Sequence, residues 1–307
     1  MFTKAENIKM LMGFTSITLA LTLSNAMAED KDYQLELPAA PSGAVTFVPP
    51  DEKDIPDNQF GEAVRYGMSL FNNTQQLRGK YVGNELNCSN CHLDSGRKAD
   101  SAPLWGAFPM YPAYRSKNDH VNTIEERIQG CFTYSMNGTP PPSGSKELTA
   151  LVTYHYWLST GAPVGKALPG RGFPTLEKAK SEPSVSRGKS VYVDNCAICH
   201  GADGQGTKVN GSYAFPPLWG KDSFNWGAGM HRVNTAADFI KANMPLGKPN
   251  SLTDQQAWDV AAFMNSHERP QDPRFKGKAS ETAETFHKHQ CFYHKEVDGT
   301  LLGKGTK

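Results

Sequence analysis

The sequence lacks an excess of charge of either sign. Without residues 1–28, the chain has 30 basic and 30 acidic residues. A protein without net charge has no global field that would attract nucleic acid or an anionic membrane surface. Nucleic acid is therefore not expected among its partners, and any recognition of an anion must come from a local cluster of basic side chains.

A hydrophobic run long enough to cross a bilayer is also missing. The apolar stretch at 10–23 is shorter than the roughly 20 residues that a transmembrane helix needs. It follows Lys4 and Lys9 and precedes Ala26-Met27-Ala28, an order typical of a secretory signal cleaved after Ala28. An uncleaved membrane anchor is the alternative. We expect residues 1–28 to be a signal peptide, the mature chain to be periplasmic, and stable membrane insertion to be absent.

Cysteine is scarce, with six residues in 307, yet four of them stand in two Cys-x-x-Cys-His pentads, at 88–92 and 196–200. This pentad is the attachment signature of a covalent c-type haem. The thiols add to the haem vinyl groups, and the histidine binds iron from the proximal side. The sequence thus predicts two covalently bound haem c groups, held by Cys88, Cys91, His92, Cys196, Cys199 and His200.

A four-cysteine zinc site and two disulfides are the alternatives for these cysteines. Zinc sites usually bring their cysteine pairs closer together along the chain and need no histidine after each pair. Export also agrees with haem, because bacterial c-type haem is attached outside the cytoplasm.

Two units of similar plan follow each other along the chain. Each has a predicted helix before its pentad, a Pro-Leu-Trp-Gly segment after it, and two further helices with apolar residues at helical spacing. The expected helices are 62–77, 122–132 and 147–159, then 186–195, one from about 235, and 253–266. Ser145 and the Thr253 capping box mark two of the starts. The predicted fold is all-α, with two tandem cytochrome c domains and one covalent haem each.

The remaining segments are defined by composition. Residues 29–58 contain five prolines and are predicted to form an extended arm. The first domain is expected at 59–160 and the second at 185–270, joined by a linker rich in proline and glycine at 161–184. Residues 271–307 form a polar C-terminal extension, expected to lie exposed on the surface.

The distal iron ligand of the second haem is predicted to be Met244. Its thioether is a soft ligand, and His/Met ligation raises the reduction potential of a haem. A methionine that only packs in the core is the alternative, and Met230 and Met264 are weaker candidates. Together with His92 and His200, Met244 belongs to the expected set of iron ligands.

The distal ligand of the first haem is predicted from the internal repeat. Counting alone would choose Met136, which stands 44 residues after His92, as Met244 does after His200. However, Val-Asn-Thr occurs at both 121–123 and 233–235, and this register, carried forward without gaps, places Cys131 opposite Asn243. We therefore expect a Cys131 thiolate, which would lower the potential of the first haem. A disulfide with Cys291 and a buried, inert thiol are the alternatives.

The surroundings of Cys131 favour a site for a small oxyanion. Arg127 and Ser135 lie four residues before and after it, on one face of the predicted helix. A guanidinium and a hydroxyl beside a thiolate would bind oxyanion oxygens. Binding of a haem propionate is the alternative role for Arg127. Arg115 and Lys117, in an upstream loop, are further candidates.

The segment Glu126–Phe132, with Ser135–Gly138 and the first pentad, resembles the di-haem thiosulfate dehydrogenases. These are relatives of the haem subunit of a sulfur-oxidising cytochrome that also has a cysteine ligand. The resemblance covers about 59–268. It implies a thiosulfate dehydrogenase or tetrathionate reductase, which interconverts two thiosulfates and tetrathionate with transfer of two electrons.

The resemblance also implies roles for individual residues. The His92/Cys131 haem would carry the chemistry, and the His200/Met244 haem would exchange electrons with a soluble or membrane-associated partner such as a small cytochrome. Cys131 would be both ligand and catalytic thiol, with sulfonate oxygens held by Arg127, Ser135 and Arg115. Some family members have a lysine beside the second-haem methionine. Asn243 stands there in this chain, which favours Met244 as a permanent ligand.

Three other interpretations remain open at this stage. A non-catalytic di-haem electron carrier would use Met136 as its first distal ligand. A di-haem peroxidase would need an acid–base residue, for which only His120 and His155 are available. The segment His287–Cys291 with His294 has the composition of a metal site, although an exposed tail explains it more simply.

Overall fold

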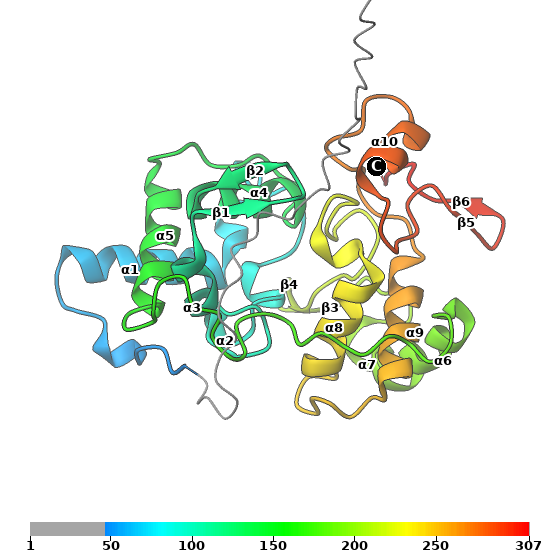
Figure 1. Cartoon of the computed structure of the whole chain (residues 1–307), viewed down its shortest axis with the longest axis horizontal. Helices are drawn as coiled ribbons and strands as arrows, with labels where there is room; N and C mark the ends of the chain where they lie inside the picture. Colours follow the sequence, from blue (N-terminus) through cyan, green and yellow to red (C-terminus); the bar gives the residue numbers. More distant parts are fainter. Residues whose placement is uncertain (1–46, 307) are drawn as a thin grey trace, which may run out of the picture. The chain divides into compact units, whose positions relative to one another are not determined.

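The computed structural model describes residues 47–306, whose course Figure 1 shows. The predicted signal peptide at 1–28 and most of the predicted arm at 29–58 lie outside the described residues. The described end of the arm contains a short 3-10 helix, η1 (Glu52–Asp54). None of the helices in 47–306 has the length and hydrophobicity needed to cross a membrane.

The first unit is mainly helical, as predicted. Its elements are α1 (Gln59–Asn72), η2 (Thr74–Leu77), η3 (Cys88–Asn90), α2 (Leu93–Gly96), α3 (Leu104–Ala107), η4 (Phe108–Met110), β1 (Ala113–Arg115), β2 (His120–Asn122), α4 (Ile124–Tyr134) and α5 (Lys146–Leu158). The helix expected at 62–77 is divided, because Asn73 leaves the helical conformation with φ −124° and ψ 68°. A capping box between Thr123 and Glu126 starts α4, and Ser145 caps α5 as predicted.

The second unit repeats this plan. It contains α6 (Val185–Asn195), α7 (Ala197–His200), β3 (Thr207–Val209), β4 (Ser212–Phe215), η5 (Gly229–His231), α8 (Val233–Asn243) and α9 (Asp254–Asn265). The capping box at Thr253 is present, with Gln256 as its partner. The strands, which the sequence did not predict, form short antiparallel hairpins, β1 with β2 and β3 with β4. The helices still make up the framework of both units.

The first and last helices of each unit cross at a glycine. A Cβ atom on Gly67 of α1 would lie 2.0 Å from the carbonyl oxygen of Ala150 in α5. A Cβ atom on Gly188 of α6 would lie 1.9 Å from the carbonyl oxygen of Asp259 in α9. Any side chain larger than hydrogen would separate the two helix backbones. The same close crossing in both units supports the predicted internal duplication.

Buried amides join the two units. Asn84 donates to the carbonyls of Ser135, at 2.8 Å, and of Ser223, at 3.1 Å. Asn225 donates to the carbonyl of Thr133 at 2.9 Å. Both asparagines are completely buried. The carbonyl of Thr133, in the last turn of α4, thus accepts from the second unit. The carbonyl of Ser135, just after the helix, accepts from an asparagine that also contacts the second unit.

The segment 161–184 contains no helix or strand but is packed against the second unit. The Asp238 carboxylate accepts the Leu176 amide at 2.9 Å, and the Glu177 carbonyl accepts the Trp258 indole at 3.0 Å. This predicted linker is therefore fixed in place along its second half.

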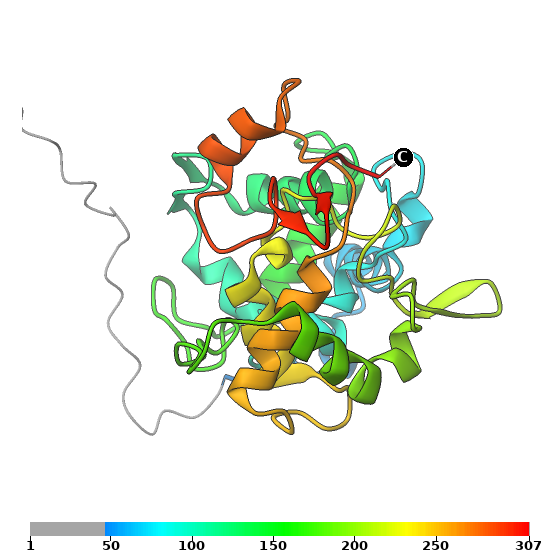
Figure 2. The same ribbon diagram turned by 90° about the vertical axis from the view of Figure 1, so that its right-hand side faces the viewer.

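The C-terminal extension contains α10 (Ala279–Phe286), β5 (Glu296–Val297) and β6 (Thr300–Leu301). Figures 1 and 2 show this segment, orange to red, beside the helices of the second unit. Cys291, Tyr293 and Leu302 are buried with Trp226 in a small apolar cluster. The expectation of an exposed tail is therefore wrong for these residues, because their side chains cover Trp226.

Candidate haem sites and the Cys131–Arg127 pair

The first pentad follows η2 and occupies η3 and the residues after it. The Thr74 hydroxyl accepts the Cys88 amide at 3.0 Å and lies 3.4 Å from Cys88 Sγ. Burial raises the pKa of the Cys88 thiol to about 12 and that of Cys91 to about 11. The apolar surroundings that raise these pKa values also suit thioether links to an apolar cofactor.

The proximal histidines are oriented in the same way in both units. His92 Nδ1 lies 2.7 Å from the carbonyl oxygen of Ala102, and His200 Nδ1 lies 2.9 Å from that of Pro216. A carbonyl oxygen only accepts, so Nδ1 carries the proton and Nε2 keeps its lone pair for iron. Burial lowers the pKa of His92 to about 4, and it also lowers the pKa of His200. Both residues therefore fit the role of a neutral axial ligand.

The two accepting carbonyls were not identified from the sequence. Each belongs to the residue immediately before a Pro-Leu-Trp-Gly segment, at 103–106 and 217–220. The repeated segment indicates duplication, and its place after each pentad is the signal in the sequence for a hydrogen-bond acceptor to the histidine. In both units it follows the pentad, and the carbonyl just before it accepts the hydrogen bond that orients the imidazole predicted to bind iron.

The alternatives for the cysteines are not present in the structure. None of the six cysteines is joined to another by a disulfide, neither within the pentads nor between Cys131 and Cys291. Within 47–306, the group of side chains close enough to hold a metal ion does not include a pentad cysteine. These findings leave covalent haem attachment as the interpretation that fits both pentads.

Cys131 and Arg127 form a close pair on α4. Arg127 Nη1 lies 2.7 Å from Cys131 Sγ, as the spacing of four residues on a helix allows. The pKa of Arg127 is raised, first by the charge of Cys131. Cys131 also adds, after burial, to the raised pKa values of Cys88 and Cys91, because it lies close to the first pentad. The predicted thiol, guanidinium and pentad are thus brought together.

Tyr111 connects two of the predicted basic residues. Arg115, at the end of β1, donates from Nη1 to the Tyr111 hydroxyl at 2.8 Å. Tyr111 also raises the pKa of Arg127, in part through a hydrogen bond. The tyrosine was missed by sequence reasoning, because its position depends on the hairpin of β1 and β2 and not on helical spacing.

Ser135 stands one turn after Cys131, at the C-terminal cap of α4. Its backbone amide donates to the carbonyl oxygen of Cys131 at 2.8 Å. The helical conformation continues at Ser135, with φ −73° and ψ −38°. The residue therefore lies on the face predicted for it, at the end of the helix.

Lys117 lies in a crowded group of cations. Its Nζ donates to the Gly227 carbonyl at 2.5 Å and stands 3.6 Å from the centre of the Tyr134 ring. The pKa of Lys117 is lowered to about 7, mainly by burial and in addition by the charges of Arg274, Arg127 and Arg232. An anion bound here would offset the repulsion among these cations.

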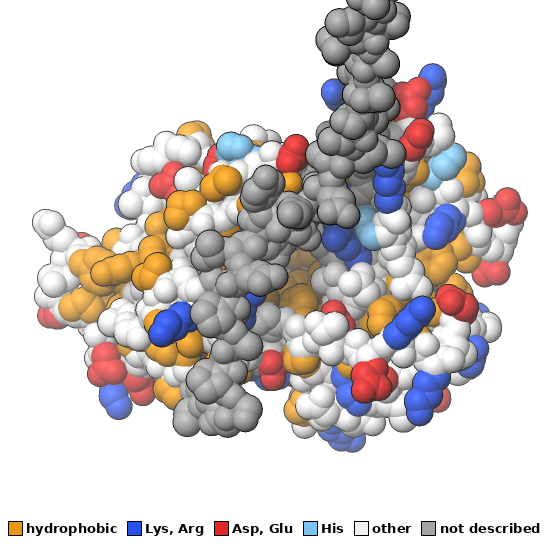
Figure 3. All heavy atoms as spheres, in the orientation of Figure 1, with side chains coloured by type: hydrophobic (Ala, Val, Ile, Leu, Met, Phe, Trp, Pro, Cys, Tyr) orange, Lys and Arg blue, Asp and Glu red, His pale blue; other side chains and the backbone are white. Residues whose placement is uncertain are grey.

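The crowding at Lys117 is local. On the face shown in Figure 3, basic and acidic side chains are intermingled and are not grouped by sign. This arrangement agrees with the formal net charge of +1 for the whole chain.

The predicted distal residue of the second unit, Met244, caps the C-terminus of α8 and is partly buried against the core. Its neighbour Asn243 is fully buried and donates to the carbonyls of Asp100, at 2.9 Å, and Phe239, at 3.2 Å. The amide therefore connects the two units. Met136, the ligand expected for an electron carrier, is 2% exposed and packs in the core.

Comparison with known proteins agrees with this architecture. Residues 67–164 match the family model described as SoxA/TsdA, cytochrome c domain, and residues 185–268 match the model for cytochrome c. The two matches confirm the all-α fold of two tandem cytochrome c domains, each of which binds one covalent haem c.

The chain is also similar to individual relatives over most of its length. It is 53% identical over 306 residues to the thiosulfate dehydrogenase of Stutzerimonas stutzeri, covering 98% of this chain and 100% of the relative. It is 50% identical over 289 residues to the thiosulfate dehydrogenase of Thiomonas intermedia, covering 94% and 91%.

A solved structure, thiosulfate dehydrogenase (TsdBA) from Marichromatium purpuratum in its as-isolated form, superimposes with a TM-score of 0.83 at 50% identity. The superposition covers 86% of this chain, which spans 59% of the length of the solved chain. The resemblance noted from the Cys131 segment is thereby confirmed, and the chain belongs to the thiosulfate dehydrogenase family of di-haem c-type cytochromes.

Proposed function

We propose that this protein is a thiosulfate dehydrogenase and tetrathionate reductase that joins two thiosulfate ions into tetrathionate with release of two electrons, and catalyses the reverse. Its family membership supports this reaction and does not favour a non-catalytic electron carrier. The observation that carries the assignment of the site is the 2.7 Å contact between Arg127 Nη1 and Cys131 Sγ, close to the first pentad.

The haem-binding residues are part of the proposal. Thioethers would form at Cys88, Cys91, Cys196 and Cys199. His92 and Cys131 would ligate the first iron, and His200 and Met244 the second. When bound, each haem supplies a centre that accepts or donates one electron at a time.

Arg127 places its guanidinium 2.7 Å from the Cys131 sulfur. A guanidinium at hydrogen-bonding distance stabilises a thiolate more than a thiol, and the thiolate is the nucleophilic form of cysteine. The Cys131 thiolate is therefore prepared to form a bond to sulfur.

Tetrathionate contains a central sulfur–sulfur bond of the kind that thiolates attack. In the reductive direction, Cys131 sulfur bonds to one central sulfur, the central bond breaks, and the first thiosulfate leaves with its electron pair. Cys131 then carries an S-thiosulfonate group. Two electrons break the new sulfur–sulfur bond, release the second thiosulfate and restore the thiolate. The oxidative direction reverses these steps and releases two electrons.

The surrounding polar groups would hold the sulfonate oxygens. Arg127 and Arg115 are connected through Tyr111, so their guanidinium groups have fixed positions. Lys117 adds a cation whose protonation a bound dianion would favour. The Ser135 hydroxyl, one turn from Cys131, would complete the set.

Replacement of Cys131 by glycine tests this proposal. We expect Cys131→Gly to lose activity in both directions while retaining both haems, and to lose the electron paramagnetic resonance signal of a thiolate-ligated low-spin haem. Met136→Leu is the control, since it conserves volume in the core and should keep both signal and turnover. Turnover by Cys131→Gly with two intact haems would contradict the covalent role. His/Met signals alone in the wild type would favour the electron carrier.

The location, the partner and the segment boundaries complete the proposal. We place the mature chain in the periplasm with a small cytochrome as redox partner, and divide it into an arm at 29–58, domains at 59–160 and 185–270, a linker at 161–184 and an extension at 271–307. The apolar stretch at 10–23 and the haem pentads support export. N-terminal sequencing of the protein from a periplasmic fraction should begin at Glu29, and an intact Met1 would contradict cleavage.

A further inference from the structure

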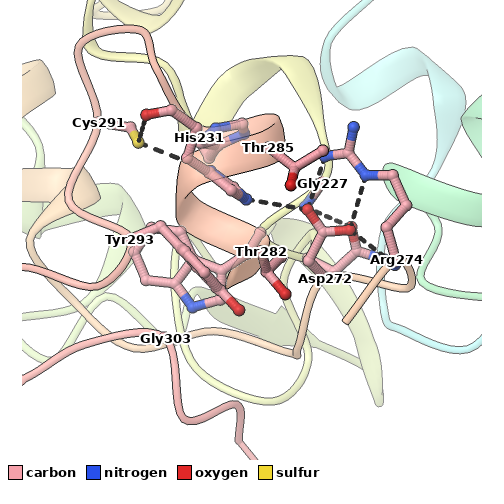
Figure 4. Close-up of polar contacts among 12 residues, drawn as sticks. Gly227, His231, Asp272, Arg274, Thr282, Thr285, Cys291, Tyr293 and Gly303 are labelled. Atoms are coloured by element: carbon pink, nitrogen blue, oxygen red, sulfur yellow. Dashed lines mark hydrogen bonds and ion pairs between the residues drawn. The ribbon is translucent and has the colours of Figure 1, made fainter. Parts of the chain in front are cut away.

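A second group of metal-ligating side chains lies outside both haem sites. His231, at the end of η5, meets His287, His289 and Cys291 of the C-terminal extension. One ligand atom from each of the four residues lies within 4.8 Å of all the others. His231 and Cys291 are each only 2% exposed. Figure 4 shows Cys291 and His231 close to each other, and Asp272 on the other side of the group, paired with Arg274.

Hydrogen bonds on the outside of the cluster orient two of the imidazoles. His231 Nδ1 contacts the Ala228 carbonyl oxygen, so its Nε2 lone pair points inward, where His289 Nε2 lies 2.7 Å away. His287 Nε2 lies 3.0 Å from the Asp272 carboxylate, so its Nδ1 lone pair points inward. A carbonyl or carboxylate behind each ring is the usual arrangement around metal-bound histidines.

The inward atoms have the spacing of a tetrahedral site. Cys291 Sγ lies 3.6 Å from His287 Nδ1. Zinc bonds of about 2.3 Å to sulfur and about 2.0 Å to nitrogen place two such ligand atoms about 3.5 Å apart. Two nitrogen ligands would stand about 3.3 Å apart, so the His231 and His289 rings would separate by about half an ångström.

A cysteine nucleophile would be the other use of Cys291, His287 and Asp272. The burial of Cys291 excludes it, because an attacking thiolate needs access for its substrate. A metal ion does not need such access once the site has formed. The Cys291 thiolate would balance one of the two charges of a divalent cation, while the Asp272 carboxylate, which pairs with Arg274 at 2.6 Å, accepts from His287.

We propose that His231, His287, His289 and Cys291 bind one zinc ion at a structural site. Four protein ligands leave no open position, which is typical of structural zinc and not of catalytic zinc. The ion would fasten the C-terminal extension to the second haem unit. The backbone hydrogen bond from the Val233 amide to the Gln290 carbonyl, 3.0 Å long, already joins the same two segments.

Element analysis of the purified holoenzyme tests the proposal directly. We expect one zinc for every two haem irons, and a zinc-edge X-ray absorption spectrum with one sulfur and three nitrogen neighbours. Haem iron does not interfere, because the edge is specific to the element. Less than about 0.1 zinc per chain, together with no uptake from added zinc after chelation, would overturn the proposal. Copper bound in place of zinc would overturn the choice of metal.

Variants assign the ligands. Cys291→Ser and His289→Gln should each weaken zinc binding by about 10-fold or more and make residues 271–306 more sensitive to protease, with both haems retained. His294→Asn is the control, since it removes an imidazole from the same segment outside the cluster and should keep zinc. Equal zinc in all three variants would contradict the assignment. If a variant fails to fold, the stoichiometry and spectrum of the wild type still decide.

Discussion

The two haem units share their proximal construction and differ on their distal side. Both have a glycine at the crossing of the first and last helices and a carbonyl before Pro-Leu-Trp-Gly that orients the histidine. Where the repeat predicts the distal ligands, one unit has Cys131 paired with Arg127, and the other has Met244 beside the buried Asn243. With the proposed ligands, a duplicated scaffold would hold a cofactor in one way and assign it two tasks by changing a few residues on one helix.

The largest effect is expected from making the first site a copy of the second. Cys131→Met removes the thiolate but keeps a sulfur ligand, so both haems should survive and the potential of the first should rise toward that of the second. Turnover in both directions should fall by about 10³-fold or more, since the nucleophile is lost. Redox titration and steady-state assays on the same preparation measure both quantities. A raised potential with unchanged turnover would show that Cys131 only tunes the haem.

Arg127→Gln keeps the thiol but removes the charge beside it. We expect kcat/KM to fall by about 10²-fold, because both thiolate stabilisation and sulfonate binding weaken. Arg97→Gln is a matched control, since the Arg97 guanidinium donates to the Pro50 carbonyl at 2.6 Å, away from the pair. A similar loss in both variants would indicate general destabilisation.

Met244→Ala opens the distal side of the second unit. The spectrum of the second haem should change and its potential should fall, while the first haem keeps its thiolate signal. Turnover should drop by about tenfold, less than for Arg127→Gln, because the sulfur chemistry remains intact. Stopped-flow reduction by thiosulfate separates the two units. Unchanged spectra would exclude Met244 as a ligand and turn attention to Met230.

The smallest effect concerns Lys117, whose pKa burial lowers to about 7. Its cation is present below that pH and is lost as the pH rises through it, so KM for thiosulfate should increase between about pH 6 and pH 8 by a few-fold. Lys117→Arg keeps the charge over this range and should flatten the profile. The same slope in wild type and variant would assign the titration to another group.

The sequence predicted the features that depend on short spacing. The pentads, the Thr253 capping box and the pairing of Arg127 with Cys131 all follow from local motifs or one helical turn. The internal repeat also identified the helix that carries Cys131. These features need no knowledge of which segments meet in space.

The features that were missed depend on contacts between distant segments. Tyr111 lies just before the hairpin of β1 and β2 and interacts with both Arg115 and Arg127. Asn73 interrupts a helix that apolar spacing alone would continue. His231 meets His287 across 56 positions of the chain, so composition alone assigned the tail to the surface. The packing of Cys291, Tyr293 and Leu302 of the tail against Trp226 is likewise a contact between distant segments, which hydrophobic periodicity does not predict.

The amides that join the units at the end of α4 have a consequence for biogenesis. Asn84 donates to Ser223 of the second unit, and Asn225, which lies in that unit, donates to Thr133 of α4. The first pentad is synthesised about a hundred residues before the second. Each buried bond contributes about 1 kcal/mol, so the end of α4 reaches its final stability only after residues 223–225 have been synthesised. The proposed catalytic thiol would therefore be fixed in place only after this part of the second haem unit has been synthesised.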